Sequence, residues 1–194
     1  MNHPGASNLY FDGNTTSGLD SILTSIRRMK MKKGIKGAVV DYLQLVRPEN
    51  MKQNREQAIG DIARSFKNLA KELGIWIILI SQLSRDRQST APSLARLRDS
   101  GQIEEAADVI YLIHRPRDGR KYPEPFADVP TDGTAMISVA KGRNIGITQF
   151  ICGFRPETTL FYPLSPADLA ALKAKAPAGE NPEKKDSPIS FAYD

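Results

Sequence analysis

Two short apolar runs on either side of one amphipathic helix pattern constrain the fold of this chain more than any other feature. The runs are GAVVDYLQL (37–45) and IWIILIS (75–81). Between them, residues 54–73 carry apolar side chains at helical spacing, and Gly74 stands where such a helix would end. Strand, helix and strand in this order predict two parallel strands joined by a right-handed crossover.

The preceding residues continue the alternation. NLYFD (8–12) has the composition of a short strand. Ser17 and Asp20 have capping-box spacing ahead of helically spaced apolar positions, which predicts a helix that ends near Gly34. The first part of the chain is therefore expected to be α/β, with a mostly parallel sheet flanked by helices.

The second half predicts antiparallel pairing. Four further runs have strand composition: VIYLIHR (109–115), TAMISVAKGR (134–143), GITQFICGF (146–154) and TLFYPL (159–164). The second and third runs are expected to form a hairpin through Asn144 and Ile145. A short helix over about 102–107 precedes the first run, residues 165–176 are expected to form a C-terminal helix, and residues 177–194 a disordered tail.

The composition fits one soluble domain. With 194 residues, 40% of them hydrophobic and 25% charged, the chain can bury one core of ordinary size. It has no apolar run long enough to span a bilayer and no signal-peptide pattern at its start, so we expect a cytoplasmic protein. The single cysteine, Cys152, is expected in the core. The net charge of +5 is a mild indication of an anionic partner such as nucleic acid.

Polar residues follow both runs of the predicted parallel pair. Asp41 ends the β-branched part of the first run. A carboxylate there either caps a turn or holds magnesium, as in P-loop nucleotide hydrolases. Gln82 ends the second run, where an amide can either report a bound phosphate or satisfy loose backbone groups.

Two basic elements follow. The loop RDRQSTAPSLARLRDSG (85–101) suits sequence-independent phosphate binding, because it is rich in arginine and has no aromatic side chain for base stacking, although an ordinary solvated connector would read the same way. Its arginines are Arg85, Arg87, Arg96 and Arg98. Lys141 and Arg143 lie two residues apart near the hairpin tip and so share a face. They can act on one object, or only protect a sheet edge.

Four segments carry a resemblance. VVDYLQL, SQLSR, LRDSGQIEEAADVIYLIHR and AKGRNIG, in this order, resemble the second half of the RecA-like motor domain of DnaB-type replicative DNA helicases, and the likeness runs from about Leu9 to Leu164. The family forms hexameric rings that hydrolyse ATP between subunits and move along single-stranded DNA. The resemblance implies a partial RecA-like domain over residues 1–164.

The resemblance also implies roles for single residues. Asp41 matches the Walker B aspartate, which holds Mg²⁺ through a water, and Gln82 matches the phosphate sensor. The loop that faces the DNA channel matches at Arg98, Asp99 and Gly101, with glycine suited to a close backbone approach or a positive φ. Lys141 and Arg143 match the pair that reaches the neighbouring subunit's ATP, with the arginine as a finger.

Departures from the family limit these roles. Gly142 and Ile145 differ from the usual hairpin pattern, which leaves the geometry of the turn open. The chain contains no G-x-x-x-x-G-K-[ST] loop to cradle phosphates. ATP and Mg²⁺ are therefore expected in a complete parent and not as tight ligands of this chain alone. The strand that is missing with the loop should leave a gap, a rearranged sheet or an edge that needs a partner.

Three functions stay open at this point. The chain can be a fragment of a helicase motor domain, a non-catalytic module that joins a helicase ring, or part of a RecA-like recombination or clock ATPase. A phosphate-cradling loop encoded upstream would favour the first, and an authentic start at Met1 the second.

Overall fold

A computed structural model describes residues 8–13, 18–48, 54–83, 91–94, 97, 100–116 and 119–175. The chain divides into two compact units, the first from residues 1–112 and 138–148 and the second from residues 113–137 and 149–194. The prediction of one partial domain over residues 1–164 stays a prediction. Within the described ranges, no helix is both long and apolar enough to cross a membrane.

The two long helices of the first unit stop at glycines. Helix α1 (Leu19–Lys33) ends at Gly34, with a φ of 64°, and α2 (Arg55–Leu73) is followed by Gly74, with a φ of 59°. Glycine adopts this left-handed conformation readily because it has no Cβ atom, which in other residues would clash with the backbone. Both predicted helix ends are therefore confirmed.

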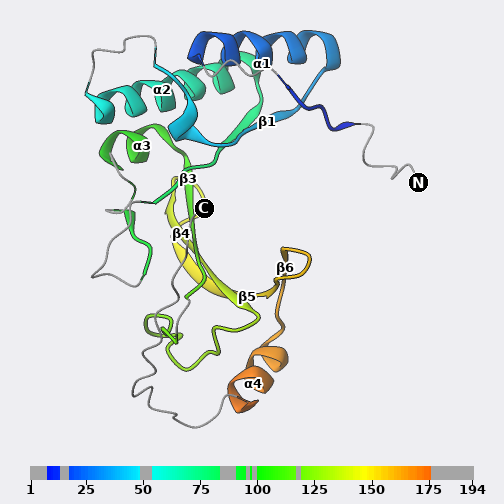
Figure 1. The fold of residues 1–194 in the computed structure, drawn as a ribbon, viewed down its shortest axis with the longest axis vertical. Helices are drawn as coiled ribbons and strands as arrows, with labels where there is room; N and C mark the ends of the chain where they lie inside the picture. Colours follow the sequence, from blue (N-terminus) through cyan, green and yellow to red (C-terminus); the bar gives the residue numbers. More distant parts are fainter. Residues whose placement is uncertain are drawn as a thin grey trace, which may run out of the picture. The chain divides into compact units, whose positions relative to one another are not determined.

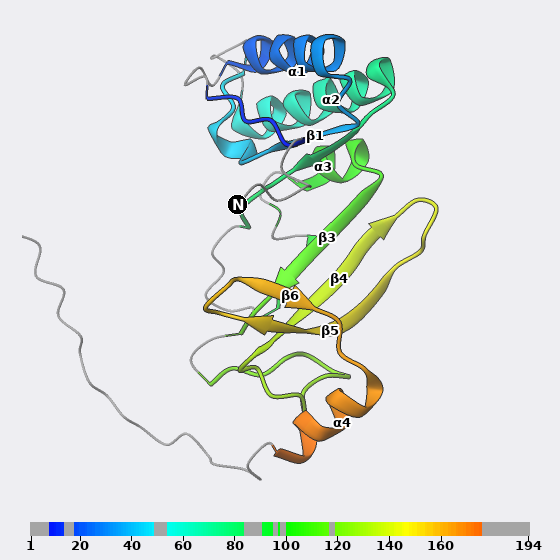
Figure 2. The same ribbon diagram turned by 90° about the vertical axis from the view of Figure 1, so that its right-hand side faces the viewer.

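The first unit contains the predicted parallel pair. Strands β1 (Gly37–Val40) and β2 (Trp76–Leu79) pair in parallel, and α1 and α2 lie on one side of them (Figures 1 and 2). Ala38 and Ile77 point to that side and pack with the apolar stripes of the helices. The buried core consists of Leu19, Leu23, Ile26, Leu43, Val46, Ile59, Ile62, Ala63, Phe66, Leu69, Ile75 and Ile103.

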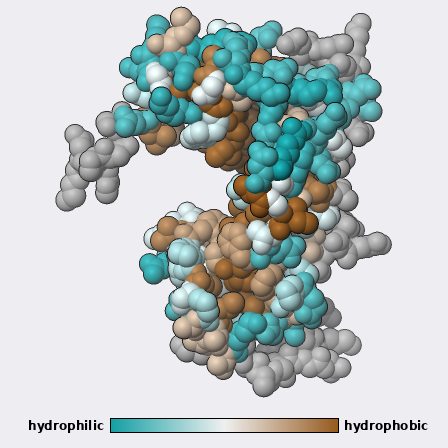
Figure 3. Space-filling model, turned by 180° about the vertical axis from the view of Figure 1, so that it is seen from behind, coloured by the Kyte–Doolittle hydropathy of each residue, from teal (hydrophilic) through white to brown (hydrophobic). Residues whose placement is uncertain are grey.

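The opposite side of this sheet is apolar and open to solvent. Val39, Trp76 and Ile78 are 57%, 55% and 52% exposed. Because Val39 pairs with Ile78, and Trp76 lies two residues before Ile78, the three side chains line one side, which we call the open β1–β2 face. Figure 3 shows apolar surface on this unit, away from its helices. Parallel sheets are normally covered on both sides, whereas this one is covered by helices on one side only.

The sheet is also interrupted, as expected. Among the described residues, β2 pairs with β1 alone, and the next strand along the chain, β3 (Val109–His114), belongs to a second sheet. The order of that sheet is β3, β4 (Thr134–Gly142), β5 (Thr148–Arg155) and β6 (Leu160–Tyr162). Strands β5 and β6 are antiparallel, and the arrows of β3 and β4 point in opposite directions in Figure 2. The predicted hairpin of β4 and β5 is confirmed.

Three local predictions need correction or fall outside the description. Residues 8–12 form no strand, and Leu9 and Phe11 are 63% and 86% exposed, because none of the strands that the structure describes pairs with this segment. Strand β1 ends at Val40 and not at Leu45, since the chain turns into a short 3-10 helix, η2 (Leu43–Leu45). The N-cap of α1 is Gly18, without a side-chain hydrogen bond, and Ser17 lies outside the described residues.

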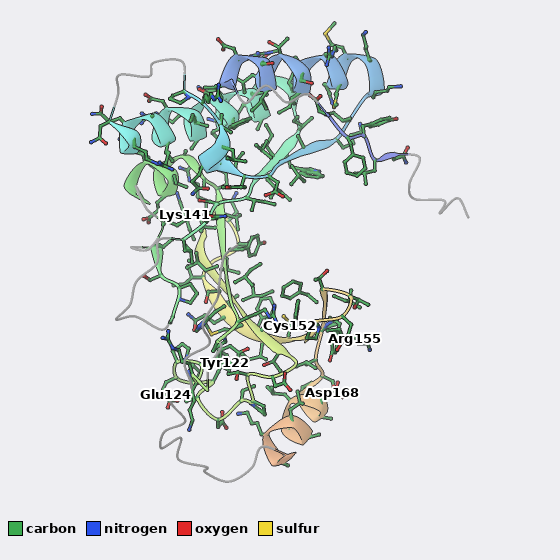
Figure 4. The ribbon with its side chains drawn as sticks, viewed as in Figure 1. Tyr122, Glu124, Lys141, Cys152, Arg155 and Asp168 are labelled. Atoms are coloured by element: carbon green, nitrogen blue, oxygen red, sulfur yellow. The ribbon has the colours of Figure 1, made fainter. Side chains whose placement is uncertain are left out.

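The second unit has its own small core. Tyr122, Val129, Met136 and Ile151 are buried together, and the Tyr122 hydroxyl lies 3.0 Å from Thr134 Oγ1. Cys152 is buried as predicted, with its Sγ 3.4 Å from the Ala135 carbonyl oxygen, and Figure 4 labels it in this unit.

Helix α4 (Pro166–Lys175) confirms the predicted C-terminal helix. Ser165 and Asp168 cap its start, because the Asp168 amide donates to Ser165 Oγ at 3.1 Å and the Ser165 amide donates to Asp168 Oδ2 at 3.0 Å. The predicted tail, residues 177–194, lies outside the described residues.

Candidate functional site

Asp41 stands at the carboxyl end of the parallel pair, as predicted. It directly follows β1 and is exposed. The two strands stay in register past this point, since the Ile80 amide donates to the Val40 carbonyl at 3.0 Å and the Leu43 amide donates to the Ile80 carbonyl at 2.8 Å. Ligands of α/β proteins bind at this end of parallel strands, so Asp41 is placed to meet one.

Gln82 lies at the same end, just beyond β2, and is also exposed. Its backbone is held by Gln44, whose Nε2 donates to the Gln82 carbonyl at 3.2 Å and whose Oε1 accepts from the Gln82 amide at 3.3 Å. Gln44 Nε2 also donates to Ser81 Oγ at 2.9 Å. Sequence reasoning missed Gln44, although its position three residues after Asp41, in the quoted DYLQL motif, was a usable signal.

The cationic pair lies where β4 turns into β5. Lys141 is the penultimate residue of β4, and Arg143 is in the turn itself. The turn closes through the Gly146 amide, which donates to the Gly142 carbonyl at 3.2 Å, and Gly146 has a φ of 72°. A Cβ added at Gly142 would lie 2.3 Å from the Gly146 carbonyl oxygen, so glycine is required there. The departure at Gly142 therefore makes a tight tip.

Both cations reach the end of helix α3 (Ser100–Ala106), next to which Figure 4 labels Lys141. Lys141 Nζ donates to the Glu104 carbonyl, and Arg143 Nη2 donates to the Glu105 carbonyl at 2.9 Å. The last carbonyls of a helix have no partner within it and carry its negative dipole, so cations are stabilised there. The two cations therefore share the end of α3 as a partner within this chain, and their action on a neighbouring subunit's nucleotide stays a prediction.

Asp108 completes this group, and sequence reasoning did not single it out. Its carbonyl accepts from the Arg143 amide at 3.0 Å, and its Oδ1 lies 3.6 Å from Arg143 Nη1. Lys67 of α2 donates to its Oδ2. The hydrogen bond from Lys67 holds the pKa of the Asp108 carboxyl below its ordinary value, against a smaller opposing effect of burial, and the charge of Arg143 also lowers this pKa.

The predicted DNA loop lies largely outside the described residues. Arg85, Arg87, Arg96, Arg98 and Asp99 are among those not described. Gly101 is exposed and lies in the first turn of α3, where it has no positive φ, and an added Cβ would meet nothing within 4 Å. Of the two reasons given for glycine here, a positive φ does not apply, because the position is helical. A close approach of its backbone to phosphate stays a prediction.

Among its described residues, the candidate site offers one carboxylate, that of Asp41. Among the described residues, no three His, Cys, Asp or Glu side chains gather as a metal-binding group. Mg²⁺ usually keeps several waters and binds through one or two carboxylates together with substrate phosphates. The exposed carboxylate of Asp41 fits that mode and does not form a complete protein cage.

Comparison with known proteins places these residues in a family. The family described as DnaB-like helicase C terminal domain matches residues 1–163. The replicative DNA helicase DnaB of Leifsonia xyli subsp. xyli is 39% identical over 139 residues, which cover 70% of this chain and 29% of that protein. The DnaB of Geobacillus stearothermophilus is 37% identical, over 73% of this chain and 31% of that protein. The chain thus spans less than a third of these relatives.

Solved structures agree on the fold. A DnaB-like replicative helicase, studied with its interactions with primase, matches 80% of this chain and 37% of its own, at 32% identity and a TM-score of 0.65. A second solved structure, of a single ATPase domain, matches 76% of this chain and 52% of its own, also at 32% identity and 0.65. The predicted fold class, an incomplete RecA-like domain, is confirmed by these neighbours.

Proposed function

The chain belongs to the DnaB-like helicase C-terminal domain family, and on this premise we propose that it supplies part of the ATP-dependent motor of a hexameric replicative DNA helicase. The motor would unwind duplex DNA in the cytoplasm by moving along single-stranded DNA. One observation carries the proposal: Asp41 and Gln82 follow neighbouring parallel strands at their carboxyl ends, and Gln44 ties the two segments together.

The residues divide the work as their chemistry allows. Asp41 would orient Mg²⁺ on the nucleotide through a water, and the Gln82 amide would bond the terminal phosphate, so that the loop after β2 responds to its loss. When bound, Mg²⁺ supplies positive charge to the phosphate oxygens. Arg143, with Lys141, would bring positive charge to the nucleotide of a neighbouring subunit.

The chain would carry only one half of each ATP site. The phosphate-cradling loop is absent from its 194 residues, and the solved ATPase domain extends over about twice the matched length, since 52% of it is covered. We expect the remainder of such a domain to pack on the open β1–β2 face. Full burial of one large apolar side chain stabilises a protein by roughly 1.5–3 kcal/mol, so covering this face would stabilise the parent.

A non-catalytic subunit is the second candidate, and one observation favours it. Lys141 and Arg143 are both held at the end of α3, and Arg143 also pairs with Asp108, although the phosphate-cradling loop is absent from the sequence. Such a chain could enter a helicase ring, act on a neighbour's nucleotide, bind single-stranded DNA and hydrolyse nothing itself.

Steady-state ATP turnover tests the proposal. The chain alone should show none above background, because one carboxylate and one amide provide neither a phosphate cradle nor an activated water. Joined to the upstream half of the ATPase domain of a related DnaB, it should hydrolyse ATP, Asp41→Ala should abolish turnover, and Glu157→Ala, in the β5–β6 turn, should not. Turnover by the chain alone that Asp41→Ala removes would disprove the half-site, and a joined protein that folds and binds ATP but stays inert would favour the second candidate.

A further inference from the structure

Asp108 contacts Arg143 through both its backbone and its side chain. The Arg143 amide donates to the Asp108 carbonyl at 3.0 Å, and Arg143 Nη1 lies 3.6 Å from Asp108 Oδ1. Asp108 stands between α3 and β3, whereas Arg143 stands in the β4–β5 turn. One contact fixes where the tip of the hairpin lies, and the other acts on the direction of the guanidinium.

The Asp108 carboxylate is itself held by a lysine of α2. Lys67 donates to Oδ2, which leaves Oδ1 to Arg143, so the two cations use different oxygens of one carboxylate. Lys67 projects from α2, the long helix whose apolar stripe is buried, and its side chain is 22% exposed. A carboxylate fixed by a partner on a packed helix is a steadier reference point than a freely rotating one.

The end of α3 adds a second constraint on the same guanidinium. Arg143 Nη2 donates to the Glu105 carbonyl at 2.9 Å, while Nη1 faces Asp108. Two contacts from different nitrogens of a planar group set the orientation of its plane. A guanidinium has five N–H donors, so the remaining donors are still available for an anion.

These contacts contribute little to stability. The side chains of Arg143 and Asp108 are 51% and 54% exposed, and solvent screens the attraction between exposed charges. A charge that acts on a transition state, in contrast, loses much of its effect when it is misplaced by about 1 Å. The contacts therefore matter more for the position of Arg143 than for the fold.

We infer that Asp108 is a positioning residue for Arg143, which holds the guanidinium in the orientation from which it reaches a neighbouring subunit's nucleotide. Lys67 acts indirectly, because it holds the Asp108 carboxylate that orients Arg143. The inference rests on the proposed function of Arg143 and deepens it, since it assigns the group that orients this side chain.

The first test uses the chain alone and needs no turnover. NMR relaxation of the Arg143 Nε–Hε group reports how firmly the guanidinium is held. Asp108→Asn should lower its order parameter, Lys67→Met should lower it less, and the charge-matched control Glu157→Gln should leave it unchanged. The far-ultraviolet circular dichroism spectrum should be the same for all variants. An order parameter that Asp108→Asn leaves unchanged would overturn the inference.

The second test uses the chain joined to the upstream half of the ATPase domain of a related DnaB, which we call the joined motor. It measures kcat and KM for ATP separately. Asp108→Asn should reduce kcat about 10- to 100-fold with little change in KM for ATP, because the lost orientation matters mainly in the transition state. Asp108→Glu, which keeps the charge on a longer side chain, should recover part of kcat. If Asp108 had only a structural role, its substitution would not lower kcat selectively while leaving KM unchanged.

Arg143→Ala separates a failure of the positioning role of Asp108 from a failure of the proposed role of Arg143. If it abolishes turnover while Asp108→Asn keeps the parent kcat, the inference fails and the proposed function stands. If Arg143→Ala keeps the parent kcat, the proposed role of Arg143 fails, and the positioning role fails with it. Loss of kcat in both variants, with partial recovery in Asp108→Glu, is the result that we expect.

Discussion

The indole ring of Trp76 lies over Gly37, its pairing partner in the parallel sheet: a Cβ atom added at Gly37 would stand 2.0 Å from Trp76 Cε2. Gly37→Ala should therefore lower the free energy of unfolding by about 1–3 kcal/mol, because the ring or the strand has to move. Urea unfolding measures this. The double variant Gly37→Ala with Trp76→Leu should recover most of the loss, and failure to recover would show that the ring is not the obstacle.

The open β1–β2 face makes a matched pair of neighbouring residues available. Ile77 packs against the helices, whereas Ile78 is 52% exposed. In the isolated chain Ile77→Glu should be strongly destabilising, since it buries a charge, and Ile78→Glu should cost less than about 1 kcal/mol. Urea unfolding of both variants compares the two sides. An equal loss of stability in the two variants would contradict an open face.

The same substitution should act differently in the joined motor. If the remainder of the ATPase domain covers the open β1–β2 face, Ile78→Glu should destabilise the joined protein by more than it destabilises the chain alone. The difference between the two unfolding free energies is the measurement. Equal effects in both contexts would mean that the face stays uncovered.

Tyr122 gives a prediction in the second unit that depends on pH. Burial raises the pKa of the Tyr122 hydroxyl, against a smaller lowering effect of its hydrogen bond with Thr134. The neutral form is therefore favoured in the folded state, and this stability is present below the unfolded pKa of about 10 and is lost as the pH rises above it. Tyr122→Phe should cost about 1 kcal/mol at pH 7 and less above pH 10. Urea unfolding of the parent and of Tyr122→Phe at both pH values measures this cost. A cost of the substitution that is larger above pH 10 than at pH 7 would contradict the prediction.

DNA binding by the loop before α3 should depend steeply on salt and little on base sequence. The reason is that arginine contacts to phosphates release counterions. Arg98→Ala should weaken binding about equally for all single-stranded sequences and reduce the slope of log affinity against log salt by about 1. Fluorescence anisotropy at several salt concentrations measures both quantities. A preference for one base sequence that persists at high salt would contradict phosphate binding.

The sequence predicted those features that depend on local pattern. Gly34 and Gly74 end helices because a left-handed residue is needed there, and Asp41 and Gln82 follow their strands because parallel strands share a carboxyl end. The pattern failed at Leu9 and its neighbours, because strand composition does not supply a pairing partner.

Contacts between segments that are far apart in the chain could not be predicted from the spacing of residues in the sequence. Asp108 lies in the segment before β3, and neither its contact with Lys67 of α2 nor its contact with Arg143 of the hairpin follows from sequence spacing. Gln44 is a different case, since it lies within the VVDYLQL motif, but only the tertiary structure shows that its amide holds the backbone of Gln82.

The most direct measurement of the central proposal is ATP turnover in rings mixed from two inactive variants of the joined motor. Asp41→Ala removes a subunit's own site, and Arg143→Ala removes only what it lends to its neighbour. With subunit exchange shown separately, turnover plotted against mixing ratio should pass through a maximum, because some interfaces then pair an intact Asp41 with an intact Arg143. Turnover that never exceeds that of either variant alone would contradict the action of Arg143 on a neighbouring site.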